Sequence, residues 1–143
     1  MLFARPARNF LDIIINMEER LDTKEEFSVI KRAKSFAHAG RGLWIFIKTT
    51  HNAWIHLVLL FVAIGLGVYF KITNVEWMML VFVGGLVLVS EAFNTAIEID
   101  IDLTSPNYHP YAKDTKDVAA GAVLISALTA FVIGVFIFGH YLI

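Results

Sequence analysis

The sequence predicts an all-α membrane protein with three transmembrane helices. Hydrophobic residues make up 57% of the 143-residue chain, whereas ordinary soluble domains are about 45–50% apolar. The excess lies after residue 52, in three apolar blocks that short polar segments separate. A transmembrane helix needs about 20 predominantly apolar residues, so each block is long enough, or nearly so, to cross a bilayer.

Each of the three spans has a sequence reason for its limits. The predicted spans cover residues 50–72, 77–102 and 115–142. The first apolar block contains only 17 residues, 54–70, with His56 as its one ionisable group, so we expect its helix to begin near Thr50. The second block has no charge from Trp77 to Ser90, and the third contains only His140 near its end. Trp54 and Trp77 stand at span ends, where aromatic residues meet the membrane interface.

The N-terminal part of the chain is basic and is predicted to lie on the cytoplasmic face of the membrane. Nine of the 12 Lys and Arg residues lie in residues 1–48, against six Asp and Glu. The positive-inside rule therefore places the N-terminus in the cytoplasm. We expect amphipathic surface helices here. Residues 1–30 form an extra segment, in which Thr23 and Glu26 predict a capping box, and residues 31–143 form the three-span domain. No nucleic-acid-binding module is present, so nucleic acid is not an expected partner.

A polar stripe on the second span is the main candidate for a functional site. Four residues fall on one face of a helix at about 100° per residue: Glu91, Asn94, Glu98 and Asp102. Asp100 points to the opposite side. A charged group deep in a span costs about 2.5–3.5 kcal/mol on insertion scales, so such residues face a protein interior, a watery cavity or a ligand. One carboxylate could hold a divalent cation and another could accept a proton from a hydroxyl. The alternative is a structural polar seam between helices or subunits.

The loop between the second and third spans is predicted to cover residues 102–117. Asp114 is a suitable N-cap for the third span, which would put Lys116 and Asp117 in its first turn. A lysine there opposes the helix dipole. Its position is easier to understand if Lys116 faces a phosphate, and the alternative is an ordinary lysine at the membrane edge.

Several other classes of site are excluded by the sequence. Cysteine is absent, so there are no disulfides or thiolate metal sites. No P-loop and no protein-kinase signature set occurs, so a nucleotide would have to be bound without a standard fold. An ion path through the membrane is disfavoured because the polar stripe occupies only one end of the second span.

The motifs in and after the second span resemble those of a known family. The pattern consists of Glu91-Ala-Phe-Asn94-Thr-Ala-Ile-Glu98, then Tyr108-His109-Pro110, then Lys116-Asp117-Val-Ala-Ala-Gly121. These residues resemble the small bacterial membrane-bound lipid kinases, the diacylglycerol kinase and undecaprenol kinase family. The resemblance extends over about residues 30–140. It implies a homotrimer in the bacterial inner membrane that transfers the γ-phosphoryl group of MgATP to a membrane lipid alcohol, with the motif style favouring undecaprenol over diacylglycerol.

The resemblance also implies a role for individual residues. Glu91 would be the general base, with Asn94 beside it, and Glu98 would hold Mg²⁺. Lys116 would contact the phosphates, with Asp117 next to it. Other residues would lie along the nucleotide: Asn107, Tyr108, His109 and, from the surface helix, Lys31. Phosphoryl transfer asks a protein mainly to position groups and neutralise charge, which these residue types can do.

One position departs from the family pattern. The family usually has a second metal-binding Glu just before the first span, and Thr50 stands there in this sequence. A threonine hydroxyl can contact Mg²⁺ but brings no charge. Thr50 is therefore a candidate metal ligand of a weakened site. The alternative reading is a catalytically impaired family member that acts as a membrane scaffold or assembly partner.

Overall fold

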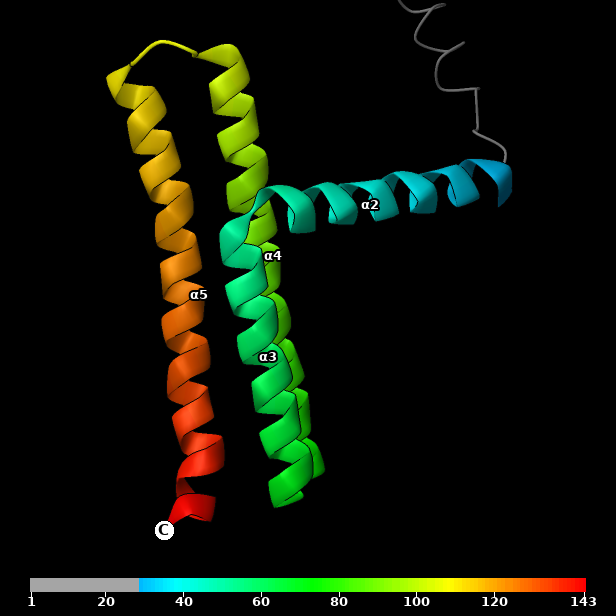
Figure 1. Ribbon diagram of the computed structural model, residues 1–143, viewed down its shortest axis with the longest axis vertical. Coiled ribbons are helices and arrows are strands. Elements are labelled where there is room, and N and C mark those ends of the chain that lie inside the picture. The colour runs from blue at the N-terminus through cyan, green and yellow to red at the C-terminus, as the bar shows by residue number, and fades with distance from the viewer. Residues whose placement is uncertain (1–28) are drawn as a thin grey trace, which may run out of the picture. The chain divides into compact units, whose positions relative to one another are not determined.

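The computed structural model describes residues 29–143, and all of the regular structure in this part of the chain is helical. The described helices are α2 (Val29–Thr49), α3 (His51–Phe70), α4 (Asn74–Thr104) and α5 (Pro110–Leu142) (Figure 1). The predicted capping box at Thr23 and Glu26 lies outside the described residues. Three of the helices, α3, α4 and α5, are long and apolar enough to cross a membrane, which confirms the predicted number of candidate spans.

The chain divides into two compact units, residues 1–40 and 41–143, and α2 passes from one to the other. In the first unit the described residues are helical, and every side chain from Lys31 to Gly40 is exposed. In the second unit, the last part of α2 buries Phe46, and the Thr50 N–H donates to the Phe46 carbonyl at 3.1 Å. This bond closes the end of α2 directly before α3 begins.

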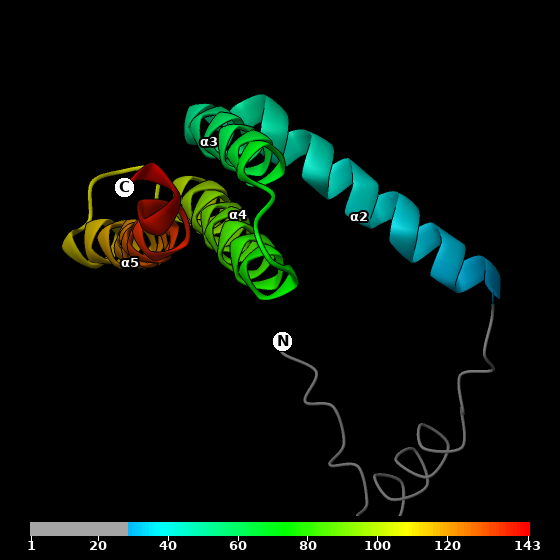
Figure 2. The same ribbon diagram turned by 90° about the horizontal axis from the view of Figure 1, so that it is seen from below.

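Helices α3, α4 and α5 run in alternating directions, and α4 packs against both of the others (Figure 1, Figure 2). Lys71 has φ 55° and ψ 48°, the left-handed conformation that ends α3. Thr73 then caps α4: its hydroxyl accepts from the Glu76 N–H at 3.4 Å, and its own N–H donates to Glu76 Oε2 at 2.7 Å. This reciprocal capping box stabilises the start of α4. The first two predicted spans leave only residues 73–76 between them, whereas the connection in the structure covers residues 71–73, and its capping box was not predicted.

The core lies at the end of the bundle where α3 turns into α4 and α5 ends. Ile72, Leu80 and Ile137 form a buried cluster, and partly buried aromatic rings pack against it: Phe70, Trp77, Phe138 and Tyr141. Elsewhere the helices expose large apolar side chains, such as Phe61, Phe82 and Phe136. Apolar surface of this extent requires lipid or another protein surface as its surroundings.

The start of α5 differs from the prediction. We expected Asp114 to be the N-cap and residues 102–117 to be a loop, but α5 begins at Pro110 with His109 as its N-cap. The Asp114 prediction is therefore wrong. Proline is favoured at the first helical position, because its missing N–H would have no partner there and its φ already suits a helix. As a result, Lys116 and Asp117 lie in the second turn of α5 rather than the first.

Gly67 is required by the close approach of α3 to the start of α4. A Cβ atom at this position would lie 2.9 Å from the Trp77 ring, which is rigid and half-buried against the core. We expect Gly67→Ala to destabilise the protein by about 1–3 kcal/mol through overpacking. Gly65 of the same helix has open space within 4 Å of the point where a Cβ atom would stand, so Gly65→Ala is the matched control.

The measurement is the thermal unfolding midpoint of both variants in detergent. Gly67→Ala should unfold at a lower temperature than the parent, and Gly65→Ala should not. Equal midpoints for the two variants would contradict this account of the α3–α4 contact.

Candidate active site

The predicted polar stripe on α4 runs from a buried end to an exposed end. Glu91 is only 1% exposed, and Asn94 is 6% exposed. Glu98 is half-buried, and Asp102 is exposed, as is Asp100 on the other side of the helix. The four residues of the stripe therefore lead from the interior of the helix bundle to its polar end.

A hydrogen bond between α3 and α4 places the start of α3 beside this stripe. The hydroxyls of Thr50 and Thr95 lie 2.8 Å apart, and the Thr95 hydroxyl also donates to the Glu91 carbonyl at 2.9 Å. Thr50 is the N-cap residue of α3, but its side chain makes no capping hydrogen bond and is directed to Thr95 instead. Thr50 therefore lies next to the segment of α4 that links Glu91 to Glu98.

The register set by Thr50 and Thr95 leaves one end of α4 without α3 beside it. Helix α4 continues for nine residues beyond Thr95, to Thr104, which is about 13 Å at 1.5 Å per residue. Figure 1 shows α4 and α5 extending past the start of α3. Glu98 and Asp102 belong to this projecting part of α4, and the Asp102 side chain is exposed.

The carboxyl group of Glu91 is buried without full hydrogen bonding. Its polar neighbours are Asn52 and His56 of α3 and Glu98 of its own helix. Nevertheless, its Oε1 atom has no hydrogen-bond partner among the described residues. A buried polar atom left in this way costs about 1–3 kcal/mol, and more when it is charged. The carboxyl group of Glu91 can therefore accept a further hydrogen bond.

Asn94 has a similar unmet oxygen. Its Nδ2 donates to Glu98 Oε1 at 2.9 Å, which orients both side chains. Its Oδ1 atom is buried and has no partner in the described part of the chain. Since residues three apart share a helix face, the free oxygens of Glu91 and Asn94 belong to one surface of α4. A substrate hydroxyl, a cation or a neighbouring protein chain could satisfy them.

Lys116 is joined to the same stripe from α5. Its Nζ forms an ion pair with Asp102 Oδ1 across the projecting ends of the two helices. Lys116 is half-buried, whereas Asp117 is exposed. The ion pair directs a positive charge to the α4 face that carries Glu98, one turn from Asp102. Lys116 therefore reaches the stripe from the second turn of α5.

The remaining predicted residues are exposed and lie outside the stripe. Asn107 and Tyr108 belong to the short connection between α4 and α5, and His109 caps α5, with its ring 5.6 Å from that of Tyr111. Lys31 is exposed on α2, in the other compact unit. Among the described residues, no group of three His, Cys, Asp or Glu side chains could hold a metal ion.

Three residues at the site were not predicted to act there: Asn52, His56 and Thr95. Asn52 and His56 belong to the segment that resembles the family, but nothing in their spacing indicates which helix they would face. Thr95 lies inside the motif of residues 91–98, but the sequence gives no sign that its hydroxyl bonds to another helix. Their contacts depend on the packing of α3 against α4.

Comparisons with known proteins show the family to which the chain belongs. The family model described as prokaryotic diacylglycerol kinase matches residues 37–138. The undecaprenol kinase of Bacillus subtilis is 37% identical over 119 residues, which cover 82% of this chain and 97% of the relative. The diacylglycerol kinase of Synechocystis is 35% identical over 70% of this chain and 58% of its own length. The diacylglycerol kinase of Helicobacter pylori strain J99 is 31% identical over 82% of this chain and 94% of its own.

The matched region contains α3, α4 and most of α5, and therefore the whole of the polar stripe together with Lys116. These matches cover more than two thirds of the chain, and the resemblance seen in its motifs is confirmed. The chain belongs to the prokaryotic diacylglycerol kinase family and is, by that membership, a lipid kinase that uses ATP as its phosphate donor.

Proposed function

We propose that this protein transfers the γ-phosphoryl group of MgATP to a membrane lipid alcohol, with undecaprenol preferred over diacylglycerol. The observation that carries the proposal is the buried carboxyl group of Glu91, whose Oε1 atom has no partner in the described residues. An acceptor held in an apolar helix bundle is suited to take a proton from a hydroxyl that arrives from the membrane.

The surroundings of Glu91 support a lipid as the acceptor substrate. An apolar cavity of about 500 Å³ lies among α3, α4 and α5, and its lining includes His56 and Val87. Val87 is one helical turn from Glu91 on α4, so a hydrocarbon chain in this region would bring its hydroxyl end close to the carboxyl group. The preference for undecaprenol is supported by the relative of that name, which matches at higher identity than the diacylglycerol kinases compared with it.

In the proposed reaction, the lipid hydroxyl donates its proton to the Glu91 carboxylate while its oxygen bonds to the γ-phosphorus. The bond from that phosphorus to the β-phosphate oxygen breaks, and ADP leaves. Asn94 orients the reacting groups through its unpartnered Oδ1 and its hydrogen bond to Glu98. Lys116 exchanges its ion pair with Asp102 for a contact with the phosphates, and Asp117 lies beside it in the sequence. Its positive charge then offsets negative charge on the transferring phosphoryl group.

The donor groups present fit Mg²⁺ bound together with a nucleotide. Mg²⁺ is commonly held by one or two carboxylates together with substrate phosphates and water. Glu98 supplies the carboxylate. The Thr50 hydroxyl bonds to Thr95, which lies one turn before Glu98 on α4, so Thr50 can supply a second oxygen. When bound, the ion would neutralise charge on the phosphates. Along the nucleotide we place Asn107, Tyr108, His109 and, from α2, Lys31.

We also propose a homotrimer in the bacterial inner membrane, with the N-terminus in the cytoplasm and α2 on the membrane surface. The exposed apolar faces of α3, α4 and α5 support an assembly in which neighbouring subunits pack against one another. The excess of Lys and Arg in residues 1–48 supports the orientation.

The test is transfer of radiolabelled γ-phosphate from MgATP by the purified protein in mixed micelles, with undecaprenol and diacylglycerol offered separately. We expect labelled lipid with both alcohols or with undecaprenol alone, and a higher kcat/KM for undecaprenol. A higher value for diacylglycerol would overturn the preference. Absence of label in both tubes would overturn the kinase proposal and favour the membrane scaffold.

The charge missing at position 50 gives a second prediction. Thr50→Glu places a carboxylate near Glu98, so we expect the Mg²⁺ concentration needed for half-maximal transfer to fall several-fold. Thr50→Gln is the matched control, because it removes the same hydroxyl and adds a side chain of the same size without charge. The measurement is transfer rate against Mg²⁺ concentration at saturating ATP. If the two variants responded alike, position 50 would not contribute to metal binding.

A further inference from the structure

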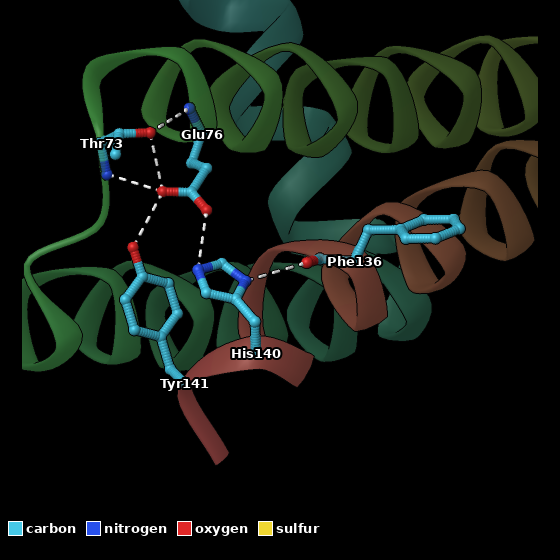
Figure 3. Close-up of polar contacts among 5 residues, drawn as sticks. All are labelled: Thr73, Glu76, Phe136, His140 and Tyr141. Atoms are coloured by element: carbon cyan, nitrogen blue, oxygen red, sulfur yellow. Dashed lines mark hydrogen bonds and ion pairs between the residues drawn. The ribbon is translucent and has the colours of Figure 1, made fainter. Parts of the chain in front are cut away.

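A second group of polar residues lies at the end of the bundle farthest from the polar stripe. Thr73 and Glu76 stand at the start of α4, and His140 and Tyr141 lie in the last turn of α5 (Figure 3). We call these four residues the distal cluster. The proposed kinase reaction uses none of them, and the inference below does not depend on that reaction.

One oxygen of Glu76 is already saturated with donors. Its Oε2 atom accepts from the Thr73 N–H at 2.7 Å, from the Thr73 hydroxyl at 2.8 Å and from the Tyr141 hydroxyl at 3.0 Å. The other oxygen, Oε1, faces His140 Nε2 at 3.5 Å (Figure 3). The carboxyl group is thus fixed by three donors, and the histidine is the group opposite its remaining oxygen.

The second nitrogen of His140 also faces an acceptor. His140 Nδ1 lies 3.4 Å from the carbonyl oxygen of Phe136. A carbonyl and a carboxylate oxygen can only accept, and a neutral imidazole has a single N–H to donate. The neutral ring can therefore satisfy only one of its two neighbours, whereas the protonated ring can donate to both.

The groups that face His140 come from α4 and α5. Glu76 comes from α4, and Tyr141 comes from α5, with its ring centroid 3.9 Å from that of His140. From α3, Phe70 stacks on Tyr141 at 5.5 Å and is uncharged. Lys71 follows Phe70 in the turn and forms no ion pair with the cluster among the described residues. Glu76 is therefore the one charged partner that the described residues offer to His140.

We propose that the distal cluster is a proton-sensitive latch, which ties the end of α5 to the start of α4 when His140 is protonated and loosens when it is neutral. The tie requires an ionised Glu76 and a charged His140. Because the closed form needs a proton on His140, the latch is favoured at lower pH and is lost as the pH rises. With the proposed orientation it faces the outside, on the opposite side of the membrane from the nucleotide.

The test measures the distance between the two helix ends as the pH changes. The chain has no cysteine, so Val75→Cys and Leu142→Cys, both at exposed positions, introduce the only thiols for spin labels. The labelled protein is diluted with unlabelled protein in lipid nanodiscs, and label-to-label distances are recorded at about pH 5 and about pH 8. We expect a narrow distance distribution at the lower pH and a broader one at the higher pH.

Three variants in the labelled background separate the latch from other causes. His140→Gln removes the charge and should give the broad distribution at both pH values. His140→Lys keeps a positive charge throughout and should give the narrow distribution at both. His38→Gln, at an exposed position of α2, is the control and should keep the pH response. A parent distribution that does not change with pH, or a response that survives in His140→Gln, would overturn the proposal.

Discussion

The constraint on which the rest of this structure depends is the burial of the Glu91 carboxyl group in an otherwise apolar part of α4. An acid in this position is costly unless something pairs with it. The neighbouring elements are arranged around that requirement: α3 brings Asn52 and His56 to the carboxyl group, and Thr95 bonds to the carbonyl of Glu91 itself. One oxygen has no partner among the described residues. We interpret this unmet acceptor as the point at which the substrate hydroxyl completes the site.

The remaining parts of the site follow from the direction of α4. Moving from Glu91 toward Thr104, the side chains on the same face change from buried to exposed, and the partner helix changes from α3 to α5. A lipid alcohol can approach the buried end from the membrane, and a charged nucleotide can approach the exposed end from water. The two substrates of a phosphoryl transfer can therefore meet along one helix face. The packed core lies at the opposite end, around Ile72, Leu80 and Ile137. The residues that stabilise the bundle are therefore different from those of the candidate active site.

The sequence predicts the helices and the stripe because both are local patterns. The apolar blocks are long, and the positions of Glu91, Asn94 and Glu98 follow directly from the geometry of a helix. Local signals also explain two misses. Both Pro110 and Asp114 are residue types that begin helices, and the helix begins at the earlier one, Pro110. Thr73 and Glu76 have the spacing of a capping box, which is easily overlooked when the segment is interpreted only as a short turn. The bond between Thr50 and Thr95 joins residues 45 apart in the chain, so no local pattern could predict it. The same is true of the Tyr141 and Glu76 pair, 65 residues apart.

The most direct test of the account is the effect of Glu91→Gln on transfer and on nucleotide binding, measured separately on the same purified protein. The amide has nearly the same shape but cannot accept the proton, so transfer to lipid should fall by about 10²–10⁴-fold, the usual contribution of a general base. The dissociation constant for MgATP, measured by calorimetry without lipid, should stay within about twofold of the parent. An equal loss of MgATP binding would contradict the account and place Glu91 in the nucleotide site.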